Sequence, residues 1–157
     1  MKKVLALVMT LVLAISLAAC SQDSGSANQS ADLPKVLETM KSEVGFSDVI
    51  DIDEAGLKSN YGIEAEDVKQ FAALADASGI KCEEVVLIEA KDADAAGRVK
   101  EKLEKRMESK LAQNKDYLPE QYAIIKKCKV EQKGNYVSMI VGAEHEKLTQ
   151  IYQEAFA

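Results

Sequence analysis

Apolar residues recur at intervals of three and four along three stretches of the chain, which is the spacing of an amphipathic helix. In residues 32–45 such a stripe begins after Asp32, a good helix cap, and Pro34 suits the first helical turn. The same pattern predicts a long helix over residues 92–114 and a closing helix over residues 144–156. The stripe of the long helix consists of Ala96, Val99, Leu103, Met107 and Leu111.

Four further stretches are rich in apolar and β-branched residues and end at turn signals. Residues 84–90 are typical of a strand. Residues 124–132 and 136–141 flank a turn that contains glycine, which predicts a hairpin. Residues 68–75 fit either a helix face or one face of a strand. A second glycine-containing turn separates them from the strand at 84–90, so we favour a strand there as well.

The expected elements follow one another as helix, short helical turn, two strands, helix, two strands and helix. The short turn closes at Tyr61-Gly62. This order contains two ββα units and predicts an α+β fold, with an antiparallel four-stranded sheet, an N-terminal helix and the helices packed on one face. Residues 32–157 are long enough for a single domain of this kind.

The first twenty residues have the layout of a bacterial lipoprotein signal. Lys2 and Lys3 precede an apolar stretch that ends in Leu17-Ala18-Ala19-Cys20. The stretch is shorter than a membrane-spanning helix of about twenty apolar residues, and an ordinary secretory cleavage site needs no cysteine. We therefore expect residues 1–19 to be removed as a signal peptide. Cys20 would then carry fatty acyl chains such as palmitate and anchor the exported protein at the outer face of the cell membrane.

The mature chain expected after cleavage begins with a polar segment and is acidic. Residues 20–31 lack large apolar side chains, so we expect them to form a flexible tether between lipid and domain. The whole chain has a formal net charge of −6, and the loss of Lys2 and Lys3 makes the remainder more acidic. This charge argues against nucleic acid as a partner, because the two would repel each other.

Four segments of the domain resemble one known family. They are Tyr61-Gly62-Ile63, Ser78-Gly79-Ile80 with Glu84-Val85-Val86, Asp116-Tyr117-Leu118-Pro119-Glu120-Gln121-Tyr122, and Lys133-Gly134-Asn135-Tyr136-Val137. The resemblance is to the DUF4358 lipoproteins, a group of uncharacterised exported domains mostly from Firmicutes, and it extends over roughly residues 33–156. It implies a lipid-anchored surface protein of a Gram-positive bacterium. It implies no catalytic residue, because the family has no established activity.

The residue types that most often carry catalysis do not form a recognisable set. His145 lies between two glutamates at a helix start, which is typical of a surface histidine. Cys82 and Cys128 either form a disulfide in the exported protein or remain small buried residues. The sequence contains no nucleophile motif, phosphate loop or zinc-ligand spacing. We therefore expect no metal, no cofactor and no enzymatic activity.

Three clusters leave alternatives open. An acidic cluster resembles the first half of a calcium-binding loop and consists of Asp48, Asp51, Asp53 and Glu54. Gly62 stands where such a loop needs a bidentate glutamate, which favours a solvated capping loop instead. The aromatic loop at residues 117–122 either packs on the domain or contacts a partner. A basic group either protects a strand edge or binds an anionic wall polymer or phospholipid. It comprises Lys126, Lys127, Lys129 and Lys133.

The sequence as a whole favours a non-enzymatic binding or interaction module that is tethered to the membrane through Cys20. One alternative is an accessory subunit of an envelope complex, which would use a sheet face or a strand edge to pair with an envelope protein. A second alternative is a hydrolase that uses carboxylates of residues 48–54.

Overall fold

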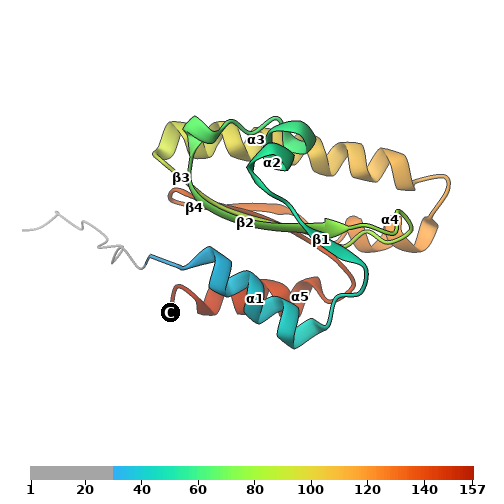
Figure 1. Cartoon of the computed structure of the whole chain (residues 1–157). Coiled ribbons are helices and arrows are strands. Elements are labelled where there is room, and N and C mark those ends of the chain that lie inside the picture. The colour runs from blue at the N-terminus through green and yellow to red at the C-terminus, as the bar shows by residue number, and fades with distance from the viewer. Residues whose placement is uncertain (1–29) are drawn as a thin grey trace, which may run out of the picture.

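The computed structural model describes residues 30–157, so the predicted signal peptide, Cys20 and most of the predicted tether lie outside the described residues. An antiparallel sheet of five strands forms the centre of the domain, with the strand order β1-β2-β3-β5-β4 (Figure 1). The strands are β1 Val49–Asp51, β2 Val68–Asp76, β3 Glu84–Ala90, β4 Val130–Lys133 and β5 Tyr136–Val141.

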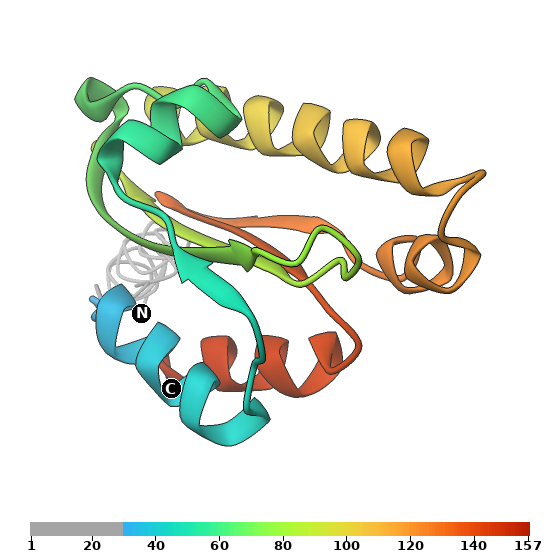
Figure 2. The ribbon, with the colours of Figure 1, turned by 45° about the vertical axis from the view of Figure 1, so that its right-hand side comes forward.

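Helices cover both faces of this sheet (Figures 1 and 2). Helices α1 and α5 lie side by side on one face, α2 and α3 lie on the other, and α4 follows α3 at one end of the sheet. Their bounds are α1 Leu33–Val44, α2 Glu54–Tyr61, α3 Ala93–Asn114, α4 Pro119–Ile125 and α5 His145–Glu154, and the 3₁₀ turn η1 Ala65–Asp67 precedes β2. The α+β class is confirmed, but the expected packing of the helices on one face is wrong.

The central strand explains why both faces are covered. Every residue of β3 is buried, and successive side chains of a strand point to opposite faces. Val86 and Ile88 belong to the apolar cluster under α2 and α3, whereas Val85 and Leu87 belong to the cluster under α1 and α5. An uninterrupted apolar run is typical of a strand that is buried on both sides, so the sequence of β3 carried this signal.

The expected four-stranded sheet is wrong by one strand, because β1 pairs with the C-terminal end of β2. The register joins Val49 to Asp76 and Asp51 to Leu74. A strand of three residues is too short to show the alternation from which strands are predicted. The two expected ββα successions do occur along the chain, as β2-β3-α3 and β4-β5-α5, but their helices lie on opposite faces of the sheet.

The region after α3 also differs from the expectation. The strand expected over residues 124–132 is confirmed only from Val130, where β4 begins, because residues 124–129 form the end of α4 and a loop. Pro119 occupies the first turn of α4, where its missing N–H is not needed. The other strand predictions are confirmed, including β2 over the ambiguous residues and the β4–β5 hairpin, whose turn contains Gly134 with φ of 58°.

Local signals set most helix ends as predicted. The Oδ1 atom of Asp32 accepts a hydrogen bond from the Lys35 N–H at 3.2 Å, and Asp92 caps α3 through the Ala95 N–H at 2.8 Å. The predicted stripe of α3 faces the sheet, with Leu103 fully buried. Among residues 30–157, no helix combines the length and the apolarity needed to cross a membrane.

Ala31, the last residue of the predicted tether, packs against the domain. Ala31 is buried, and its carbonyl oxygen accepts a hydrogen bond from Gln70 Nε2 at 2.8 Å. The Oε1 atom of Gln70 in turn accepts a hydrogen bond from the Leu33 N–H at 3.1 Å. Strand β2 therefore holds the chain where it enters the domain.

Candidate functional site

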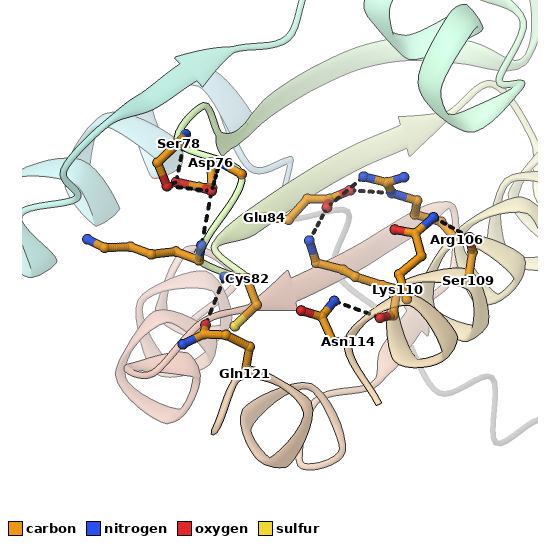
Figure 3. A network of polar contacts seen from close by, with 12 residues as sticks. Asp76, Ser78, Cys82, Glu84, Arg106, Ser109, Lys110, Asn114 and Gln121 are labelled. Atoms are coloured by element: carbon orange, nitrogen blue, oxygen red, sulfur yellow. Dashed lines mark hydrogen bonds and ion pairs between the residues drawn. The ribbon is translucent and has the colours of Figure 1, made fainter. Parts of the chain in front are cut away.

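The most deeply buried charge of the domain is the carboxylate of Glu84, at the start of β3. Two cations from α3 converge on it (Figure 3). Arg106 Nε lies 2.8 Å from Oε1, and Lys110 Nζ lies 2.7 Å from Oε2. Because residues four apart share one face of a helix, the single helix α3 delivers both partners to the same carboxylate.

The surroundings of Glu84 keep it ionised. Burial by itself would raise the pKa of Glu84, but the hydrogen bond from Arg106 and the positive charge of Lys110 lower this pKa overall. Tyr61 lies beside the cluster, with the Arg106 guanidinium 5.6 Å from its ring centre, and burial together with the charge of Glu84 raises the pKa of its hydroxyl. Arg106 and Lys110 occupy both carboxylate oxygens and the tyrosine stays neutral, so we expect removal of the Glu84 carboxylate to destabilise the fold.

Two other buried carboxylates are neutralised in the same way. Asp67 accepts hydrogen bonds from Arg98, which lower its pKa more than burial raises it. Glu89 accepts hydrogen bonds from Lys69 and Gln70. Burial would raise the pKa of Glu89, but these hydrogen bonds lower it overall. Asp67 thus joins η1 to α3, and Glu89 joins β3 to β2.

A groove of about 310 Å³ lies between α2 and the N-terminal half of β2. Its lining is mainly apolar: Leu57 and Ile63 are buried, and Val68 and Phe71 are half-buried. Exposed charged residues stand at its rim. The complete lining consists of Glu54, Leu57, Ile63, Ala65, Val68, Lys69, Gln70 and Phe71.

One wall of this groove is a strand edge that β1 leaves open. Strand β1 pairs with β2 as far as Leu74, and the Ile52 N–H then donates to the Ala73 carbonyl at 2.9 Å. Asp53 caps α2, so the chain turns into a helix before it can reach the rest of β2. The N-terminal half of β2 therefore has β3 on one side and the groove on the other.

The acidic cluster predicted from the sequence does not converge on one point. Asp51 forms an ion pair with Lys41 at 2.7 Å, and Asp53 Oδ1 accepts a hydrogen bond from the Gly56 N–H at 2.8 Å. Asp48 occupies a turn with φ of 57°. Within the described range, no group of three or more His, Cys, Asp and Glu residues is placed to hold a metal ion. Asp51 thus joins β1 to α1, and Asp53 caps α2.

The basic group is dispersed rather than gathered into one surface. Lys126 lies 5.6 Å from the centre of the Tyr122 ring and Lys133 lies 5.1 Å from that of Phe156. Lys129 forms an ion pair with Glu131. Lys127 and Lys129 line a depression of about 350 Å³, which His145 and two glutamates also line. The mixed charge of this depression does not favour a polyanion.

The remaining candidate residues lie apart from the groove. His145 is half-buried at the first turn of α5, and Tyr117 is 85% exposed in the loop before α4. Both cysteines are free thiols that pack against the apolar cluster under α3. Burial raises the pKa of Cys82 to about 11 and also raises that of Cys128, so neither thiol is activated as a nucleophile.

The fold and the groove define an α+β domain whose five-stranded antiparallel sheet lies between two helical layers and has a partly open edge. The chain belongs to the family described as "Domain of unknown function (DUF4358)", whose model matches residues 42–142 and so includes the groove and the Glu84 cluster. This match confirms the family resemblance. No curated protein and no solved structure matches the chain.

Proposed function

We propose that this protein is a non-enzymatic binding module, held at the outer face of the membrane by lipid on Cys20, and that the groove between α2 and β2 is its ligand site. The observation that carries the proposal is an apolar groove bounded by a strand edge without a neighbouring strand. Polar and main-chain groups around an apolar floor are the usual composition of a ligand site.

The disposition of the charged residues supports a binding role over a catalytic one. The buried carboxylates of Asp67, Glu84 and Glu89 all have cationic partners. The carboxylates proposed for a hydrolase, Asp51 and Asp53, are engaged with Lys41 and a helix N-terminus. The open strand edge also suits the alternative of an accessory subunit in an envelope complex, since such a subunit would pair through the same surface.

Replacing the proposed lipid-bearing residue tests the tether. We expect Cys20→Ser to abolish incorporation of a fatty-acid analogue in growing cells, because serine offers no thiol for the lipid. The readout is the labelled band of this protein after metabolic labelling, with Cys82→Ser as the matched control that should keep the label. Continued labelling of the Cys20→Ser chain would contradict the lipoprotein proposal.

A photo-reactive residue placed in the groove tests the ligand site. Ala65 is exposed and lines the groove, and Glu108 is exposed on α3 away from it. We expect a photo-crosslinker at position 65 to give a discrete adduct in intact cells and one at position 108 to give none. Equal yields from the two positions, or no adduct from position 65, would contradict the assignment of the groove.

A further inference from the structure

We infer that the ligand of the groove is an extended peptide segment of a partner protein, which adds to the sheet as a further strand beside the N-terminal half of β2. This inference rests on the proposed function, because it names the ligand class for the same groove. The segment would take the position that β1 would occupy if it continued past Ile52. Such strand addition uses main-chain hydrogen bonds for affinity and side-chain pockets for specificity.

The register of the sheet directs the main chain of Phe71 towards the groove. In an antiparallel strand, the N–H and C=O groups of successive residues point alternately to the two neighbouring strands. The Asp76 N–H donates to the carbonyl oxygen of Glu83, just before β3, at 2.8 Å. The carbonyl oxygen of Ala73 instead accepts from the Ile52 N–H, just after β1, at 2.9 Å. Phe71 lies two residues before Ala73 and pairs with Ile88 of β3. The N–H and C=O of Phe71 therefore point to the edge of β2 that β1 does not cover.

The two ends of the sheet differ in how their edges are protected. The opposite edge strand, β4, is preceded by Lys129 and ends with Lys133, and charged side chains at an edge discourage pairing with another chain. The open part of β2 also carries a lysine and an irregular register between Val68 and Gln70. Lys69 is neutralised by Glu89, however, and Phe71 beyond the irregularity faces a groove with an apolar floor. An added strand would place every second side chain on that floor, against Leu57 and Ile63. We therefore expect a segment in which apolar residues alternate with polar ones.

The charges at the rim favour a partner with a basic residue over a second copy of this chain. Lys69 of the groove lining is paired with Glu89 at 2.6 Å. Glu54 is exposed at the groove and forms no ion pair within the described part of the chain. A lysine or arginine in the added segment would complement Glu54, whereas the net charge of −6 disfavours self-association.

A peptide selected from a random-peptide display library is the probe for this inference. The target is the full mature chain with Cys20→Ser, and the selected peptide is then synthesised with and without N-methyl groups at alternate positions. We expect the unmodified peptide to slow hydrogen exchange of the Phe71 amide, measured by NMR. N-methylation on the paired positions should weaken its binding by roughly tenfold or more, because each methyl removes a main-chain donor.

Two variants at position 71 provide a matched comparison. Phe71→Ala and Phe71→Pro both lack the ring, but only proline lacks the N–H, and proline is tolerated where a strand edge faces solvent. We expect Phe71→Pro to bind the peptide roughly tenfold more weakly than Phe71→Ala. Circular dichroism confirms that both variants fold, and the N-methylated peptides test the same hydrogen bonds on the unmodified chain if the proline variant unfolds.

The outcomes separate this inference from the proposed function. Peptide binding that shifts groove residues without protecting the Phe71 amide would overturn strand addition and leave the groove as a ligand site. Failure to select any peptide, together with a discrete adduct from position 65, would also overturn only the peptide inference. Self-association through the same edge in sedimentation experiments would replace the partner by a second copy. No selected peptide and no adduct from position 65 would overturn both proposals.

Discussion

Replacement of Glu84 by glutamine is expected to lower the free energy of unfolding by about 3–5 kcal/mol, because it leaves Arg106 and Lys110 without their buried counter-charge. Urea denaturation followed by circular dichroism measures the effect. The matched control is Glu101→Gln, which breaks the exposed ion pair with Lys105 on the same helix and should change stability by no more than about 1 kcal/mol. Equal effects of the two variants would show that the cluster does not stabilise the fold.

The loss of unfolding free energy caused by Glu84→Gln should depend on pH in a defined direction. The pKa of Glu84 is lower in the folded chain than its ordinary value of 4.5, so the folded state binds fewer protons than the unfolded state as Glu84 titrates. Its contribution is therefore fully present above about pH 4.5 and is lost as the pH falls through the folded pKa. The stability gap between the unmodified chain and Glu84→Gln should narrow over that acidic range. A gap that widens there would contradict the assignment.

Substitution of Leu103 by aspartate is expected to unfold the domain. Leu103 is fully buried in the cluster between α3 and the sheet, and a charge without a partner in that position destabilises by several kcal/mol. The readout is the thermal melt followed by circular dichroism. Ser109→Asp introduces the same residue at an exposed position of α3 and should leave the melt nearly unchanged. An unchanged melt for Leu103→Asp would contradict the burial of this face.

The elements that could be predicted from the sequence are those defined by local signals. The cap at Asp32 and the turn at Gly134 each depend on a few adjacent residues, and both appear where expected. Strand β1 and helix α4 could not be predicted in this way. The first is a strand only through its pairing with β2, and the second is a single short helix that begins at Pro119.

The candidate groove depends on relations between residues that are distant in sequence. Phe71 lies on an open strand edge because the chain turns into α2 at Asp53. The sequence does not show where the pairing of β1 with β2 ends. In the sequence, Arg106 and Lys110 are only two of the charged residues on the polar face of α3. A usable signal was present, since Arg106 and Lys110 lie one helical turn apart on that face, but only the packing of α3 on β3 shows that they meet a buried carboxylate.

Hydrogen–deuterium exchange of the lipidated chain in native membranes tests the central claim most directly. The reference is the purified soluble chain with Cys20→Ser. If the groove holds a partner segment, exchange in residues 68–72 should be slower in the membranes, and exchange in the exposed positions of α3 should be the same in both samples. Unchanged exchange in residues 68–72, or slowing confined to the opposite edge at β4, would contradict the claim that this domain binds its partner through the groove between α2 and β2.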